Sequence, residues 1–274
     1  MSPALIPIKS YQDLSIPTAY APSYRLSPIL SPALARCAVL FCGLFAHLNN
    51  FYYLYSMKPR LIIFDFDGTL ADTRQNIVRT MQATIRRMGL AERDDAQCAA
   101  TIGLTLYDGF LRLYPDMDGH AAELCVAKYR EIYFEDVASA IPQLFDGVAE
   151  TLHALRGEGI LLAVASSRSS PSLLLFMRER AIDHLFSYIL GSDSVSRHKP
   201  EPEAVEVILQ KSGFNPSEAI VVGDMPVDIL MARSASVRAV GVSWGNATRE
   251  ELTAAGADAV LDDIRELLPI VEQM

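Results

Sequence analysis

The sequence predicts an α/β fold in which helices cover both faces of a parallel sheet and an all-helical segment follows the first strand. Three observations support this. Residues 61–70 have the pattern of a buried strand that ends in carboxylates. Residues 73–143 carry apolar side chains at helical spacing. After residue 143, short apolar stretches alternate with amphipathic helical patterns, as in parallel sheets that are buried on both faces.

Composition narrows the class of protein. The chain has 274 residues, of which half are apolar, and a formal net charge of −9, a balance typical of globular proteins. Lys and Arg form no cluster, which argues against a nucleic-acid partner. The cysteines form no C-x-x-C pair and have no metal-ligand spacing with histidine, so we interpret them as reduced thiols of a cytoplasmic protein: Cys37, Cys42, Cys98 and Cys125. Nothing in the sequence indicates an oligomeric state.

Residues 1–57 differ from the rest of the chain. Proline and serine recur through the first 32 residues, which predicts an extended, poorly ordered tail. The apolar run 37–46 is about half as long as the roughly 20 residues of a membrane-spanning helix. We therefore expect no membrane span, with a weakly membrane-bound or packing helix as the alternative. A further hypothesis is that Met57 is the working start, so that residues 1–56 are not part of the native protein.

The first strand carries the most informative motif. Four apolar residues, 61–64, precede Asp65-Phe66-Asp67-Gly68-Thr69-Leu70. Residues two apart in a strand point to the same side, so the two carboxylates leave the strand end together. Two like charges this close need a cation or a shared proton, and Mg²⁺ prefers oxygen ligands. Gly68 permits a sharp turn and a close approach of the backbone to a ligand. The alternative is a solvated turn.

The all-helical segment begins with a helix from about Thr73 to Met88, which Gly89 ends. Beyond residue 143 we expect a helix over 146–156, one after Pro171, one from Pro200 and one from Pro226 to Ser234. The strands between and after them are expected at 160–165, 188–190, 219–222, 239–242 and 259–261. Ligands of such sheets bind beyond the carboxyl ends of the strands.

Polar residues follow the strand expected at 160–165. Ser166 and Ser167 lie directly after it, just before a helix. A hydroxyl group and free backbone N–H groups at a helix N-terminus form a phosphate site, whereas the alternative is an ordinary serine cap.

Lys199 lies directly before Pro200, where we expect a helix to begin. The positive end of a helix dipole disfavours a cation, and a bound anion would remove the conflict. A plain surface lysine is the alternative.

Asp224 follows the strand at 219–222, and Asp228 lies one helical turn further on. Acidic residues also favour helix N-termini without any ligand. Here, however, both would join Asp65 and Asp67 at one sheet edge, where the cluster would repel itself without a cation.

With these four motifs in order, the sequence resembles the haloacid dehalogenase superfamily over residues 58–274. The matching motifs are Asp65–Leu70, Ser166, Lys199 and Gly223–Asp228. The helical insertion resembles the cap of the phosphoglycolate phosphatase-like and β-phosphoglucomutase-like branch. The resemblance implies a Rossmann-like catalytic core at 58–72 and 144–274, with a helical cap at 73–143.

The resemblance also implies residue roles. Asp65 would attack phosphorus and form an aspartyl-phosphate, and Asp67 would act as general acid and then general base. Ser166 and Lys199 would hold the phosphoryl group, together with Gly68 and Ser167. Mg²⁺ would bind the Asp65 carboxylate, the Asp67 backbone carbonyl and Asp224, with Asp228 in support of Lys199 or of a metal-bound water.

The expected function is a Mg²⁺-dependent phosphatase acting on a small phosphomonoester: phosphoglycolate, a sugar phosphate or a nucleotide. Asp67 favours such esters, because the dehalogenases of the superfamily lack an acid at this position. The alternatives are a phosphosugar mutase and a non-catalytic phosphate-binding protein. Arg74, Arg112 and Tyr107 are candidate cap contacts to the substrate, with a surface role as the alternative. We expect the cap to close over the site through hinges at 71–75 and 140–147.

Overall fold

The structure is a computed structural model that describes residues 59–136 and 142–273. The predictions for residues 1–57 lie outside these ranges, as does part of the second expected hinge. None of the described helices combines the length and the apolar character that crossing a membrane requires.

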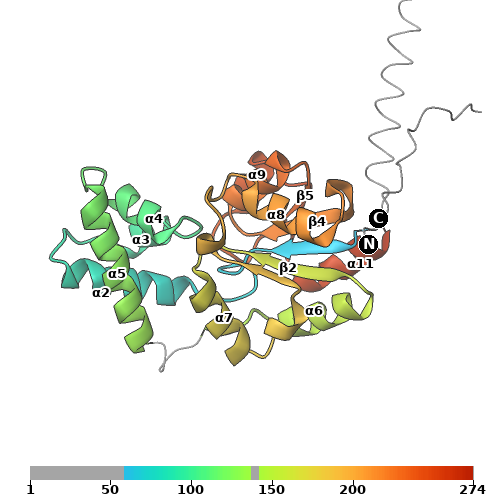
Figure 1. Ribbon diagram of the computed structural model, residues 1–274, viewed down its shortest axis with the longest axis horizontal. Helices are drawn as coiled ribbons and strands as arrows, with labels where there is room; N and C mark the ends of the chain where they lie inside the picture. The colour runs from blue at the N-terminus through green and yellow to red at the C-terminus, as the bar shows by residue number, and fades with distance from the viewer. Residues whose placement is uncertain (1–58, 137–141, 274) are drawn as a thin grey trace, which may run out of the picture. The chain divides into compact units, whose positions relative to one another are not determined.

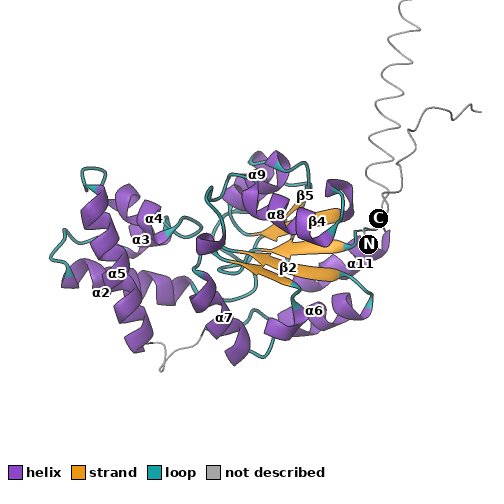
Figure 2. Cartoon of the chain, viewed as in Figure 1, coloured by secondary structure: helices purple, strands orange, loops and turns teal. Residues whose placement is uncertain are grey.

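A parallel sheet forms the centre of the described part of the chain (Figure 2). Its six strands lie in the order β3-β2-β1-β4-β5-β6, and every neighbouring pair is parallel. The predicted strands are confirmed to within one residue at each end. Their bounds are β1 Leu61–Phe64, β2 Leu161–Ala165, β3 Tyr188–Leu190, β4 Ala219–Gly223, β5 Arg238–Val242 and β6 Ala259–Leu261.

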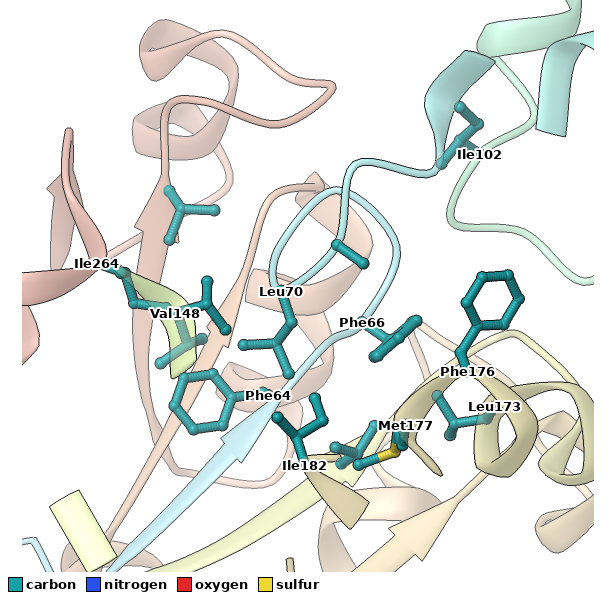
Figure 3. Packing of buried hydrophobic residues seen from close by; sticks show 14 of the residues in the cluster. Phe64, Phe66, Leu70, Ile102, Val148, Leu173, Phe176, Met177, Ile182 and Ile264 are labelled. Atoms are coloured by element: carbon teal, nitrogen blue, oxygen red, sulfur yellow. The ribbon is translucent and has the colours of Figure 1, made fainter. Parts of the chain in front are cut away.

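β1 lies in the middle of the sheet and is fully buried. Its side chains alternate between two apolar clusters. Ile62 and Phe64 point into one cluster, and Leu61 and Ile63 into the other. Figure 3 shows Phe64 among Val148, Ile264 and other apolar side chains of the first cluster. Burial on both faces explains why this strand is apolar at every position rather than at alternate ones.

Helices cover both faces of the sheet, as predicted (Figure 1). One face packs against α6, α7 and α11, and the other against α8, α9 and α10. Their bounds are α6 Val148–Gly157, α7 Ser170–Glu179, α8 Glu203–Ser212, α9 Pro226–Ser234, α10 Arg249–Ala254 and α11 Leu267–Gln273.

A helical, cap-like insert separates β1 from α6. It comprises α2 Arg74–Arg87, α3 Asp95–Ala99, α4 Leu106–Leu113 and α5 Gly119–Asp136. α5 packs against α2 and α4, and Gly89, with φ of 63°, follows α2 as expected for a helix C-terminus. Within its described residues the insert holds helices and no strand. The exact boundaries at 73 and 143 stay a prediction.

The helix expected from Pro200 is wrong in its start, because α8 begins at Glu203. Glu201 precedes Pro202, and a residue before proline disfavours the helical conformation. Residues 199–202 form a turn instead. Lys199 therefore does not lie at the N-terminus of a helix, and the predicted conflict with a helix dipole does not arise there.

Candidate active site

The predicted polar residues lie at the carboxyl edge of the sheet. Asp65 directly follows β1, Ser166 directly follows β2, and Asp224 directly follows β4. β1 pairs with both other strands, so that Phe64 lies beside Val164 and Val222. Adjacent parallel strands thus place the three side chains next to one another.

Lys199 connects two of the carboxylates. Its Nζ donates to Oδ1 of Asp65 at 2.5 Å and to Oδ1 of Asp228 at 2.6 Å. All three side chains are at most 10% exposed. Buried charges are stable only when they are paired and hydrogen-bonded, which this arrangement achieves. Lys199 is therefore a buried member of the site and not a surface lysine.

The site holds several ionisable side chains although it is buried. Burial lowers the pKa of Lys199, but Asp228 and Asp65 outweigh it and raise that pKa above its ordinary value. Burial raises the pKa of Asp65 well above the ordinary range; Lys199 opposes this, and Asp228 and Asp224 add to it. Burial and the neighbouring Asp228 raise the pKa of Asp224 to about 6. One lysine thus leaves the carboxylates with an unbalanced negative charge.

This charge is suited to a metal ion. Asp65, Asp224 and Asp228 each offer a carboxylate oxygen, and these atoms lie within 4.8 Å of one another. The set consists of buried oxygen donors, which Mg²⁺ prefers. The Asp67 carboxylate is not part of this group, and a contribution of Asp67 through its backbone carbonyl stays a prediction.

Asp224 is held in place by residues of two loops. Thr69 Oγ1 donates to Asp224 Oδ1 at 3.1 Å, and the backbone N–H and side-chain amide of Asn246 both donate to Oδ2 at 2.8 Å. Gly68 has φ of +91°, and a Cβ atom there would lie 2.3 Å from Asp224 Oδ2. Glycine is therefore required at position 68 both by the backbone conformation and by the approach of the carboxylate.

Asp67 has a partner of its own. Arg168 donates to both of its oxygens, Nη2 to Oδ1 at 2.6 Å and Nε to Oδ2 at 3.1 Å. The guanidinium also donates from Nη1 to the Tyr133 hydroxyl at 2.7 Å and to Ser172 Oγ at 2.9 Å. Tyr133 belongs to α5 of the insert, so Arg168 links Asp67 to both parts of the fold.

The serines after β2 occupy different positions. Ser166 is buried, and its Oγ accepts the backbone N–H of Arg168 at 3.2 Å. Ser167 Oγ donates to the carbonyl of Gly103 in the insert at 2.7 Å. In this conformation Ser167 is thus engaged with the insert, and both serines line the cavity described next.

A cavity of about 310 Å³ lies between the insert and the sheet edge. Asp65, Asp67, Ser166 and Ser167 line its floor. Of the candidate cap contacts, Tyr107 lines the cavity. Arg74 instead donates to Asn246 at 2.8 Å, and Arg112 is not among the residues of the cavity wall. The four floor residues were all predicted site residues.

Arg168, Asn246 and Thr69 were not predicted as site residues. Arg168 lies within the polar run after β2, and Thr69 lies within the first motif. Each is therefore close in sequence to a predicted site residue. Asn246 follows β5, and its position beyond the carboxyl end of a fifth strand is the signal that could have identified it.

The fold and this site define a class: an α/β protein with a buried carboxylate cluster at the carboxyl edge of a parallel sheet and a helical cap-like insert. Residues 62–242, more than half of the chain, match the family model described as "Haloacid dehalogenase-like hydrolase". The chain belongs to this family, in the branch that includes phosphoglycolate phosphatases and pyrophosphatases, and it is a phosphatase of the family.

Three similar proteins illustrate the branch. "Probable phosphatase IndB" of Dickeya dadantii is 34% identical over 77% of this chain and 93% of its own length. "Pyrophosphatase PpaX" of Listeria innocua is 32% identical over 78% of this chain and 97% of its own length. The crystal structure of a predicted phosphoglycolate phosphatase from Haemophilus somnus has a TM-score of 0.72 and 26% identity, over 78% of this chain and 99% of that one.

Proposed function

We propose that this enzyme is a Mg²⁺-dependent phosphatase that hydrolyses a small phosphomonoester through an aspartyl-phosphate on Asp65. The observation that carries the proposal is the buried group of Asp65, Lys199, Asp228 and Asp224 next to a cavity. A carboxylate fixed at a cavity floor beside a buried cation is suited to attack phosphorus.

In the first half of the reaction, an oxygen of Asp65 attacks phosphorus and the bond from phosphorus to the leaving oxygen breaks. A proton from the Asp67 carboxyl neutralises that oxygen as it leaves as an alcohol. In the second half, Asp67 takes a proton from water, the water oxygen attacks phosphorus, and the bond to Asp65 breaks. Inorganic phosphate leaves, and both aspartates return to their starting states.

Lys199 and Ser166 hold the phosphoryl group during both halves. Lys199 supplies a positive charge that is already desolvated and fixed by Asp228, so it stabilises developing negative charge without reorganisation. Ser166 offers a hydroxyl at the end of β2. Mg²⁺ bound by Asp65, Asp224 and neighbouring oxygens would neutralise charge on the phosphoryl oxygens.

Asp67 must reach the leaving oxygen for its role. In this structure each of its oxygens accepts one hydrogen bond from Arg168, which leaves a second lone pair on each for a proton, and opening of the pair would free the carboxyl group to turn toward the substrate. Arg168 also binds Tyr133 of the insert, so a movement of the insert relative to the sheet would open the Arg168–Asp67 pair. Movement of the insert would in this way be coupled to proton transfer by Asp67.

The test is phosphate release by the purified chain with and without Mg²⁺, on phosphoglycolate, hexose phosphates, nucleotides and pyrophosphate. We expect Mg²⁺-dependent release that Asp65→Asn abolishes. Release that persists in Asp65→Asn, or no release from any compound, would refute the proposal.

A further inference from the structure

The loop that follows β5 contacts both the carboxylate cluster and the insert. We call residues 243–247 the β5 loop. Asn246 occupies one oxygen of Asp224: its backbone N–H and its side-chain amide both donate to Oδ2 at 2.8 Å. Oδ1 accepts one hydrogen bond, from Thr69 Oγ1 at 3.1 Å. Since each carboxylate oxygen has two lone pairs, the described residues leave an acceptor position on Oδ1 and fill those on Oδ2.

Packing also ties Asp224 to the β5 loop. A Cβ atom at Gly245 of this loop would lie 2.4 Å from Asp224 Oδ2, and one at Gly68 would lie 2.3 Å from the same atom. The carboxylate thus fills the space between two backbone segments, one of which is the β5 loop itself. Because interiors are close-packed, a shift of this loop would be transmitted to the carboxylate by contact as well as by hydrogen bonds.

The β5 loop contacts both chain connections between the sheet and the insert. Arg74, the first residue of α2, donates from Nη1 to Asn246 Oδ1 at 2.8 Å. The Trp244 ring packs against Phe145, in the segment that returns from the insert, with the ring centroids 6.3 Å apart. Trp244 Nε1 also donates to the Thr69 carbonyl at 3.1 Å. A movement of the insert on these connections would therefore act on the loop.

Arg74 fixes which way the amide of Asn246 points. A guanidinium offers only donors, and an ionised carboxylate only acceptors. The amide oxygen must therefore face Arg74 while the amide nitrogen faces Asp224, and a flipped amide would lose both hydrogen bonds. Arg74 is exposed, so its bond to Asn246 opens without leaving a buried, unpaired charge. The contact is thus suited to form and break as the insert moves.

We propose, on the basis of the Mg²⁺-dependent activity proposed above, that Asn246 is a positioning residue of the metal site and that Arg74 makes its action depend on the position of the insert. Asn246 acts on Asp224 and not on the ion: it holds Oδ2 so that Oδ1 is presented to the metal. Coupling between two equilibria is reciprocal, so bound Mg²⁺ favours the position of the insert in which Arg74 contacts Asn246.

The first test is Mg²⁺ binding to the full chain without substrate, measured by isothermal titration calorimetry. We expect Asn246→Ala to raise the dissociation constant about tenfold to a hundredfold, the range found for partners of metal ligands. Ser243→Ala is the matched control, because Ser243 lies in the same loop but binds the exposed Asp262, and it should leave the constant unchanged. Trp244 is the only tryptophan of the sequence, so its fluorescence should report the same constants from the loop itself.

A second variant separates positioning from charge by the sign of its effect. Arg74→Met removes a positive charge near the site, which by itself would strengthen the binding of a cation. We expect the dissociation constant to rise instead, by about threefold or more, because the amide of Asn246 loses the bond that orients it. Arg79→Met removes the same charge from an exposed position of the same helix and should not raise the constant.

Equal constants in Asn246→Ala and Ser243→Ala would overturn the positioning role, and an unchanged or lower constant in Arg74→Met would overturn the link to the insert. The proposed phosphatase survives either result if the unaltered protein binds Mg²⁺ and Asp224→Asn weakens that binding. No binding by the unaltered protein would overturn its metal site and this inference together. Circular dichroism shows whether each variant is folded, and if Asn246→Ala is not, Arg74→Met decides, since Arg74 is exposed.

Discussion

Arg168 holds Asp67 by both carboxylate oxygens, at 2.6 and 3.1 Å, although the two residues are 101 positions apart in the sequence. The side chains are 9% and 14% exposed. The guanidinium also lies over the rings of Tyr133 and Phe176, 5.3 and 4.8 Å from their centroids. Removing either partner would leave the other charged and buried, which makes this pair a sensitive point of the fold and of the site.

We predict that Arg168→Met lowers the free energy of unfolding by about 3 kcal/mol, because Asp67 is left as an uncompensated buried charge. Urea denaturation measures this loss. In a double-mutant cycle, Asp67→Asn should recover part of it, since the second change removes the unpaired charge.

Arg178→Met is the matched control, because Arg178 lies on α7, the helix that follows Arg168, in a more exposed pair with Asp183 at 3.7 Å. It should cost less than about 1 kcal/mol. Equal losses in the two variants, or strict additivity in the cycle, would contradict a buried, coupled Arg168–Asp67 pair.

Asp67→Asn should trap the aspartyl-phosphate when the substrate is p-nitrophenyl phosphate. The nitrophenolate leaves without a proton, so the first half-reaction proceeds, whereas water is no longer deprotonated for the second. Rapid quench should show a burst of nitrophenol equal to the enzyme concentration, and intact mass should show one added phosphoryl group. A linear time course at the rate of the unaltered enzyme would argue against the role of Asp67.

Asp65→Asn should lower kcat by at least about a thousandfold, since the attacking oxygen is replaced by an amide. Lys199 keeps Asp228 as a partner, so the circular dichroism spectrum and melting temperature should stay close to those of the unaltered protein. Activity within a few-fold of the unaltered enzyme would end the assignment of Asp65 as nucleophile. A collapsed spectrum would show instead that the residue is needed for folding.

The stability of the metal-free protein should fall as the pH rises from 4 to 7. The folded pKa of Asp224, about 6, lies above its ordinary value of 3.8, so the native state binds the extra proton between these values. The contribution of Asp224 is fully present below 3.8 and is lost as the pH rises through 6, by an amount on the order of 3 kcal/mol.

Urea midpoints of the metal-free protein across this range measure the effect against Asp224→Asn, in which the dependence should flatten. The Asn fits the site because Thr69 Oγ1 can accept as well as donate. Mg²⁺ should raise the midpoint at pH 7 in the unaltered protein and much less in the variant. An identical pH dependence in both proteins would contradict the raised pKa of Asp224.

The sequence predicts the strands well because each strand is a local pattern. Short apolar runs such as 219–223 are buried on both faces, and burial on both faces is visible along a single segment. The prediction that a helix begins at Pro200 is wrong for a local reason as well, because Pro202 restricts the backbone of Glu201 and α8 begins at Glu203. That polar residues gather at the carboxyl edge also follows from the order of parallel strands.

The partners of the site residues could not be predicted in the same way. Thr69 and Asn246 both hold Asp224, across 155 and 22 positions of the sequence. Arg168 is one of several polar residues after β2, and no local sequence pattern indicates that it pairs with Asp67. The cavity wall is likewise assembled from helices whose apolar residues, taken singly, fit a packed core equally well.

By itself the sequence determined the order of strands and helices, the carboxylates at the strand ends and the resemblance that placed the chain in its family. Only the tertiary structure decided that Lys199 binds Asp65 and Asp228, that Arg168 holds Asp67, and that apolar side chains of the insert face the site. The physical reason is that periodicity and turn chemistry act within one segment, whereas an ion pair or a cavity wall depends on distances between segments that only packing brings together.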